Sequence, residues 1–506
     1  MNLSNRVFKA LRLALILVAV ASRATAHGAE TLRAGVAKVD ITDVDAGPVN
    51  DPLYVKALVI SSGATTAVIV TVDAVAIAEI GSIRNDFLAN VRAQIQKELG
   101  LNPAHVLINA SHCHGKVCAD VETRTVAAIK AAAKELVTVT IGAGCGREDR
   151  VMENRRLKLK SGRTADVRHA YSLPADDEIA EVGPVDPEIG ILRLDRTNGQ
   201  TLAVVYNFAC HPIQGVPSGG NTADMIGFAS KVLEEAFGNG AMALFLQGCG
   251  GDINPVRYKD VSQPRDAEPL GHLLGLSTLQ AAKALKCVED DRLQVINETI
   301  ALPRADNAER IAALEGEQLR LLKSLRGTSL NLKTFMQLSV QYNLADSFPS
   351  YYSHRYLHDR ALGRDHLEKF DAENRRNIEA YLQNIAVMEE LTRVQTNLAL
   401  LNKHHARNVA AGTRTLDVEI VGLRLGEFVL ITFPGELTVR IGLNIKSAAP
   451  HEKTFVAGYT NGYIFYAPTT EQLLNPGGAQ EDCDTLVAPD WQPIFETKAA
   501  EMLRRL

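Results

Sequence analysis

The sequence is poor in cysteine and tryptophan, with seven cysteines and one tryptophan among 506 residues. This scarcity excludes a disulfide-dense scaffold. The only close pair, Cys113 and Cys118, has C-x4-C spacing, which does not match a structural zinc module. Because the count is odd, at least one cysteine is free or pairs with another chain. We expect the cysteines to be mainly small buried neighbours, with an occasional disulfide.

Long apolar runs are also missing, since no segment after the N-terminus approaches 18 apolar residues. That absence predicts no transmembrane segment in the mature chain. The N-terminus has basic residues, then an apolar run at 13–21 and the small residues 24–26, a pattern that predicts a signal peptide over 1–26. We therefore expect a secreted or periplasmic protein.

An excess of positive charge is absent too. Removal of residues 1–26 leaves 50 basic and 59 acidic residues, a formal charge of −9. A negative chain gives no electrostatic support for nucleic-acid binding. We therefore expect no nucleic-acid partner.

Two catalytic signatures are missing. The chain has no G-x-S-x-G elbow and no G-x-x-x-x-G-K-[ST] loop, which argues against a serine hydrolase and a P-loop nucleotide site. A cysteine nucleophile at Cys113 or Cys210 beside a histidine stays open, but sequence neighbours on a strand rarely face each other.

The pattern that is present alternates strands with helices. Apolar runs predict strands, and 3.6-residue periodicity predicts the helices between them, which together indicate an α/β fold with a mixed-sheet core and an active site at strand ends. The expected strands include 66–77, 105–115, 137–144, 202–210, 241–246, 416–431 and 455–458, and the expected helices are 80–99, 122–136, 225–237, 268–286 and 491–506.

Residues 303–410 differ in character, with long charged amphipathic runs around a tyrosine-rich middle. They predict a helical insertion or cap between the two parts of one catalytic domain, 27–302 and 411–506. His404 and His405 lie in this insertion, and we expect them to be solvated helix residues.

The stretch 105–115, HVLINASHCHG, places His112 and His114 after a short apolar run. Two residues at i and i+2 point to the same side if the backbone is still extended. Three other strand-like runs also end in candidate ligands, namely His211, a glycine-rich loop with Asp252, and Glu436.

The ends of neighbouring strands can meet at one edge of an α/β sheet. Two histidines and one carboxylate with an open position form a familiar catalytic zinc set, so the pattern favours a metal hydrolase. Arg155 lies in a polar stretch, 152–156, without clear periodicity. Such an arginine is usually on the surface, although its position after a strand leaves room for contact with an oxyanion.

Five short motifs occur in order: NASHCHG, FACHP, QGCGGDINP, PGE and NGYIFYAPT. Together they resemble the N-terminal catalytic domain of the neutral/alkaline non-lysosomal ceramidases and their bacterial relatives. The similarity begins near Gly35 and continues almost to the end of the chain. Because the last motif lies close to residue 506, we expect these residues to lack the immunoglobulin-like C-terminal domain of true ceramidases.

The resemblance implies a zinc amidase with one Zn²⁺ per chain. Its ligands fall on His112, His211, Glu436 and Tyr466. The family's oxyanion-stabilising groups fall on His114 and Arg155, while a zinc-activated water attacks the amide carbon.

Two positions depart from the family pattern. Asn254 replaces a serine that contacts substrate, and residues 476–479 contain no tyrosine where the family has one near the reacting carbonyl. The resemblance implies an amidohydrolase that acts on a small-molecule or lipid N-acyl substrate, with a ceramide-like compound as the leading expectation. A zinc esterase, a carbohydrate N-deacylase and an inactive secreted metal-binding protein are the alternatives.

Overall fold

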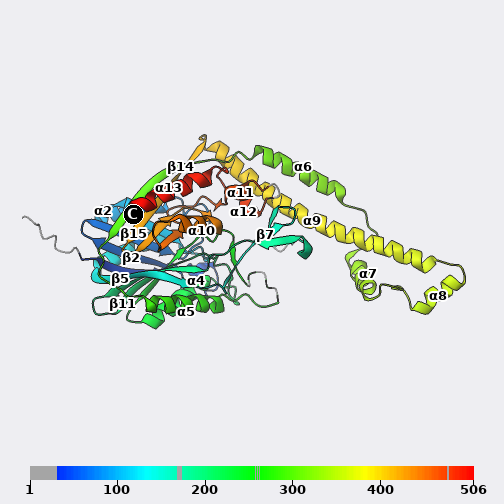
Figure 1. Ribbon diagram of the computed structural model, residues 1–506, viewed down its shortest axis with the longest axis horizontal. Helices are drawn as coiled ribbons and strands as arrows, with labels where there is room; N and C mark the ends of the chain where they lie inside the picture. Colours follow the sequence, from blue (N-terminus) through cyan, green and yellow to red (C-terminus); the bar gives the residue numbers. More distant parts are fainter. Residues whose placement is uncertain (1–30, 168–173, 257, 259, 261, 476–477) are drawn as a thin grey trace, which may run out of the picture.

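The computed structural model describes residues 31–167, 174–256, 258, 260, 262–475 and 478–506. The expected signal peptide, 1–26, lies outside the described residues. Figure 1 shows a core of sheets and helices from which a long helical segment extends to one side.

The larger sheet has eight strands in the order β12-β11-β10-β5-β1-β2-β3-β4. Two of its pairs, β11 with β12 and β3 with β4, are parallel, and the others are antiparallel. Its strands are β1 (Arg33–Asp40), β2 (Tyr54–Ser62), β3 (Thr65–Val72), β4 (Val106–Ala110), β5 (Val137–Arg147), β10 (Glu188–Arg196), β11 (Thr201–Phe208) and β12 (Met242–Gln247).

A second, four-stranded sheet has the order β14-β15-β16-β18, and three small sheets complete the core. The four strands are β14 (Leu293–Pro303), β15 (Thr415–Leu425), β16 (Phe428–Thr432) and β18 (Thr454–Ala457). The small sheets are β13 (Ile253–Pro255) with β6 (Met152–Asn154), β17 (Glu436–Leu437) with β19 (Tyr466–Ala467), and β7 (Arg156–Leu159) with β8 (Thr164–Asp166) and β9 (Ile179–Val182).

The two large sheets share an apolar core that includes Leu192, Leu244, Leu423 and Phe455. All eight residues of β11 are buried, as expected for a strand covered on both faces. Helices α4 (Asp224–Phe237) and α5 (Glu268–Ala284) pack near β10–β12. Helices α2 (Phe87–Leu99) and α3 (Val121–Lys134) pack near β1–β4, and α10 (Val439–Ala448) and α13 (Trp491–Arg505) pack near the second sheet. The predicted mixed-sheet α/β fold is therefore confirmed.

The helices of the core are short to medium in length. They are α2 (Phe87–Leu99), α3 (Val121–Lys134), α4 (Asp224–Phe237), α5 (Glu268–Ala284), α10 (Val439–Ala448), α11 (Thr470–Leu473), α12 (Gln480–Cys483) and α13 (Trp491–Arg505), with 3₁₀ turns at Val44–Ala46, Pro103–His105 and Asp176–Glu178.

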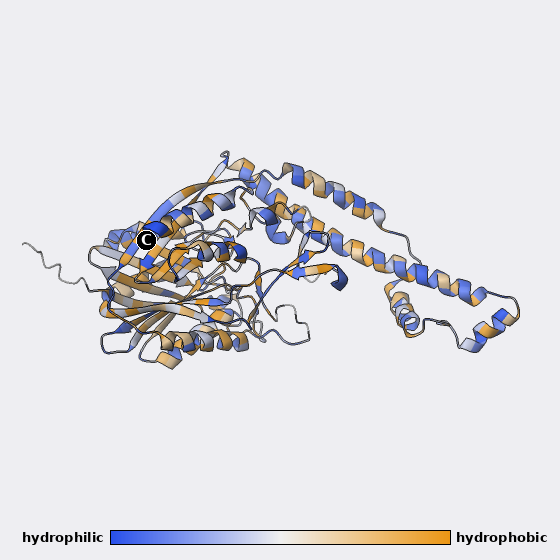
Figure 2. Cartoon of the chain, in the orientation of Figure 1, coloured by the Kyte–Doolittle hydropathy of each residue, from blue (hydrophilic) through white to orange (hydrophobic). Residues whose placement is uncertain are grey.

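Between β14 and β15, which pair along their full lengths, the chain forms α6 (Ala308–Ser324), α7 (Leu332–Leu344), α8 (Ser353–Ala361) and α9 (His366–Ala410). We call residues 308–410 the helical arm. Figure 2 shows hydrophilic residues along the whole of the 45-residue α9. Within the described residues, none of the helices combines the length and apolar character that crossing a bilayer requires.

A cluster of hydrogen-bonded polar side chains around Asp371 orders the distal end of the arm. The Asp371 carboxylate of α9 accepts hydrogen bonds from Tyr342 of α7 (2.8 Å), Tyr356 of α8 and Ser350. Phe335 stacks on Tyr381, with ring centroids 4.3 Å apart. The tyrosine-rich stretch therefore attaches α7 and α8 to α9.

Three expectations need correction. The helix expected at 80–99 begins only at Phe87, and the strand expected over 105–115 is confined to Val106–Ala110. His404 is fully buried, with Nε2 2.6 Å from Asp484 Oδ1 and its ring against Phe465. It is not a solvated residue, because the C-terminal part of α9 packs on the segment that contains Asp484.

Candidate metal centre

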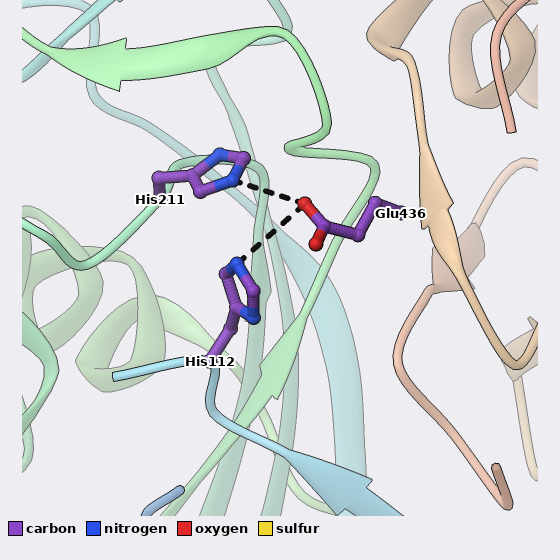
Figure 3. Close-up of side chains that lie close together, drawn as sticks. All are labelled: His112, His211 and Glu436. Carbon is purple, nitrogen blue, oxygen red and sulfur yellow. Dashed lines mark hydrogen bonds and ion pairs between the residues drawn. The ribbon is translucent and has the colours of Figure 1, made fainter. Parts of the chain in front are cut away.

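The three candidate ligands meet where strands of different sheets end. His112 follows β4, His211 follows β11, and Glu436 begins β17, shortly after β16. Each residue is buried, and one potential ligand atom of each lies within 4.8 Å of the others. In Figure 3 a nitrogen of each imidazole faces the Glu436 carboxylate.

The separations suit a small cation. Glu436 Oε2 lies 3.1 Å from His211 Nε2 and 3.6 Å from His112 Nε2. A tetrahedral shell with bonds of about 2.0–2.1 Å spaces its ligand atoms roughly 3.3 Å apart.

Hydrogen bonding fixes the tautomer of both histidines. His112 Nδ1 lies 2.6 Å from the Val75 carbonyl oxygen, and His211 Nδ1 lies 2.5 Å from that of Gly250. Because a carbonyl oxygen only accepts, each Nδ1 carries a hydrogen and each neutral imidazole presents a lone pair at Nε2. Two lone pairs then face a carboxylate, an arrangement that a shared cation would satisfy.

The protonation states agree with this arrangement. Burial lowers the pKa of His112 to about 4, so that the imidazole is neutral near pH 7. Burial alone would raise the pKa of Glu436, yet this pKa lies well below its usual range, with the hydrogen bond donated by Tyr463 among the causes, so the carboxylate is ionised. The residues present therefore fit a divalent metal such as zinc.

Two tyrosines that the sequence did not nominate hold the carboxylate. Tyr459 donates to Glu436 Oε2 (3.1 Å), and Tyr463 donates to Oε1. Burial raises the pKa of both phenols well above the usual value, which keeps them protonated as donors. Their place in the aromatic-rich stretch that follows β18 was the only signal available.

His112 has left-handed backbone geometry, with φ of 67°. Because this conformation costs energy in a non-glycine residue, such positions are enriched at functional sites. The backbone is not extended here, so the expected i, i+2 alignment with His114 does not apply. His114 is exposed and its ring lies 5.5 Å from that of His112, whereas Cys113 is buried.

Tyr466, the fourth expected ligand, is the register partner of Glu436 in the parallel pair of β17 and β19. Arg155 Nη2 lies 3.2 Å from the Tyr466 hydroxyl. The register places Tyr466 next to Glu436 on the neighbouring strand.

Arg155 is buried between β6 and β7 rather than on the surface. Besides Tyr466, it donates to Glu481 Oε1 (2.6 Å), to Asn254 Oδ1 (3.0 Å) and to the Gly251 carbonyl (2.5 Å). Burial alone would lower its pKa, but Glu481 and Tyr466 raise it above the usual range. The guanidinium is charged, and most of its donors are already engaged.

Asn254, in β13, is fully buried. Its Oδ1 accepts from Arg155, and its Nδ2 has no hydrogen-bond partner among the described residues. A buried amide donor without a partner is costly, and such a group is usual where a ligand completes the hydrogen bonding.

The glycine-rich loop after β12 brings backbone close to the centre. A Cβ atom on Gly251 would lie 2.7 Å from the Glu436 carbonyl oxygen, so only glycine fits there. Asp252, another strand-end candidate, accepts from the Val439 amide (2.7 Å) at the start of α10. The structure thus places Asp252 at a helix terminus rather than in the ligand group.

No protein-family model and no curated protein matches the chain. Solved structures do match it. Neutral ceramidase from Pseudomonas aeruginosa aligns with a TM-score of 0.57 and 16% identity, over 94% of this chain and 75% of that one. A ceramidase complexed with C2 aligns with a TM-score of 0.58 and 17% identity, over 94% and 76%. The chain has a neutral ceramidase-like fold.

Proposed function

We propose that the chain is a secreted, zinc-dependent amidohydrolase that cleaves the amide bond of an N-acyl, ceramide-like compound. The observation that supports the proposal most directly is that the Nε2 atoms of His112 and His211 both face the carboxylate of Glu436, and that all three side chains are buried. The likeness of fold to two ceramidase structures supports the choice of an amide bond. The signal-like pattern of residues 1–26 supports export to the periplasm or the medium.

In this proposal His112, His211, Glu436 and Tyr466 would hold the metal. When bound, zinc supplies a Lewis acid and a nucleophilic water at neutral pH. The backbone carbonyls of Val75 and Gly250 hold the two imidazoles in the ligating tautomer.

The neighbouring residues would handle the substrate. Arg155 contributes a fixed positive charge beside Tyr466, while Asn254 Nδ2 offers an unused donor to a substrate oxygen. His114, exposed next to His112, would donate to the oxyanion of the tetrahedral intermediate. Since four groups already occupy Arg155, its charge matters more in this arrangement than a direct hydrogen bond to substrate.

A substrate panel tests the proposal. Purified zinc-loaded protein would be incubated with N-acyl sphingoid bases, N-acyl amino acids, N-acetylated sugars and simple esters, and the released acid measured. We expect fatty acid release from the N-acyl sphingoid bases, lost in His211→Ala. Hydrolysis of esters or sugars alone would reassign the bond, and full metal occupancy without turnover would favour a binding protein.

A further inference from the structure

Glu481 is the residue that fixes Arg155 in the candidate site, although the sequence gives it no role. It lies on α12, 326 positions from Arg155, and its Oε1 accepts from Arg155 Nε at 2.6 Å. Both side chains are buried. An arginine held at Nε has its guanidinium plane fixed, so the two Nη atoms can point only where that plane directs them.

Those two Nη atoms reach the metal centre. Nη2 contacts the Tyr466 hydroxyl and the Gly251 carbonyl, and Nη1 contacts Asn254 Oδ1. The contact at Nη1 also sets the amide of Asn254, because it identifies Oδ1 as the acceptor and leaves Nδ2 as the donor. The position of Glu481 is thus transmitted to a proposed ligand and to a proposed substrate contact.

The segment that contains Glu481 is held by the base of the helical arm, by which we mean the parts of α6 and α9 that contact the core. Arg310 of α6 donates to the Asp482 carbonyl (2.8 Å), and Asn397 of α9 donates to the Gly478 carbonyl (3.1 Å). His404 of α9 contacts Asp484, whose carbonyl in turn accepts from the Tyr466 amide (3.0 Å). The arm base therefore supports the side of the site that holds Arg155 and Tyr466.

We propose that Glu481 is a positioning residue that holds Arg155 against Tyr466 and Asn254, with the base of the helical arm as its support. This inference rests on the proposed function, because it assigns Tyr466 to the metal and Asn254 to the substrate. Glu481 itself would touch neither the metal nor the substrate.

Asp482 provides a matched control. It neighbours Glu481 on α12, is equally buried, and pairs with Arg156 rather than Arg155. Glu481 also approaches Arg156, at 3.1 Å, so both carboxylates balance that buried arginine. Neutralising either residue removes a buried negative charge, but only Glu481→Gln changes the contact with Arg155.

The experiment compares Glu481→Gln with Asp482→Asn. If these neutral variants fail to fold, the charge-conserving pair Glu481→Asp and Asp482→Glu is compared instead. Zinc affinity is measured by chelator competition, and kcat and KM on the best substrate of the panel. Residues that orient a metal site typically affect affinity or activity 10- to 100-fold. We expect a loss of about that size in zinc affinity and kcat for the Glu481 variants, and less than about threefold for the Asp482 variants.

Equal losses at both positions, or no loss at Glu481, would overturn the inference. If the wild type binds zinc but hydrolyses nothing, the proposed function fails while the affinity comparison still decides the role of Glu481. If the wild type binds no zinc, both fail.

Discussion

Individual hydrogen bonds determine what the centre can bind. Each imidazole donates from Nδ1 to a backbone carbonyl, and Glu436 receives two phenol hydrogen bonds. In metal sites, partners of this kind orient the ligands and fix their protonation, so they contribute to metal affinity without touching the metal.

Tyr463→Phe tests that contribution. The change removes the donor to Glu436 Oε1 while keeping the buried ring, so we expect zinc affinity to fall about tenfold with little change in thermal stability. Chelator competition measures the affinity. Tyr206→Phe is the matched control, because its buried hydroxyl contacts Ser230 and Ile226 in another core cluster. Equal effects of the two changes would contradict the account.

Asn254→Asp tests the proposed substrate contact. Aspartate keeps an acceptor for Arg155 but replaces the Nδ2 donor by an oxygen. If that donor binds a substrate oxygen in the transition state, kcat/KM should fall about 10²-fold. Metal content, measured on the same preparation, should stay at the wild-type level. Unchanged kcat/KM would show that the donor is not used.

At the scale of elements, the strand ends explain why part of the site was predictable. His112, His211 and Glu436 follow apolar runs, and the ends of such strands meet at sheet edges. Tyr459, Tyr463 and Glu481 could not be found that way. The two tyrosines lie in an aromatic stretch that normally indicates packing, and Glu481 meets Arg155 only through a tertiary contact.

The same limit applies to helix surfaces. The amphipathic runs within residues 303–410 predict helices, and the structure has helices there, since amphipathic periodicity is a local property. The burial of His404 was missed because it depends on Asp484, 80 positions away in the sequence. The early start expected for α2 was wrong because residues 80–86 continue the apolar pattern without forming a helix.

Helix α4 begins at the buried carboxylate of Asp224, whose protonation makes the stability of the fold depend on pH. Asp224 has φ of 56° and accepts from the amides of Gly215 and Met225. Burial raises its pKa from 3.8 to about 6, despite the lowering effect of those hydrogen bonds. The folded state therefore holds this proton more tightly than the unfolded state, and the stability associated with it is present below about pH 4 and lost as the pH rises through 6.

The matching experiment measures the free energy of unfolding of the wild type and Asp224→Asn between pH 4 and pH 7, by urea denaturation. Asparagine does not titrate and accepts left-handed geometry. We expect the wild type to lose roughly 2 kcal/mol relative to the variant over this range. A difference between the two proteins that is independent of pH would contradict the assignment.

At the scale of the whole molecule, the arm divides into a base that contacts the core and a distal part with local contacts. Arg326 and Asn384 exchange two hydrogen bonds at the junction, from the Arg326 amide to Asn384 Oδ1 (2.9 Å) and from Asn384 Nδ2 to the Arg326 carbonyl (2.7 Å). The polar cluster around Asp371 lies in the distal part, on the far side of that junction from the core.

Replacing residues 327–383 by a short glycine linker should therefore leave the core intact. We expect the melting temperature to change by only a few degrees and zinc affinity to stay within about threefold, because Arg310 and Asn397 remain in place. Calorimetry and chelator competition measure these quantities. Loss of zinc binding in the shortened chain would show that the distal arm supports the site directly.

The proposed function depends on one metal ion held by His112, His211 and Glu436. Its most direct test is the metal content of the chain purified without chelators and reconstituted with zinc, measured by mass spectrometry beside His211→Ala. We expect about one zinc per chain in the wild type and almost none in the variant. A wild type that binds no zinc, or a variant that binds as much as the wild type, would contradict the proposal.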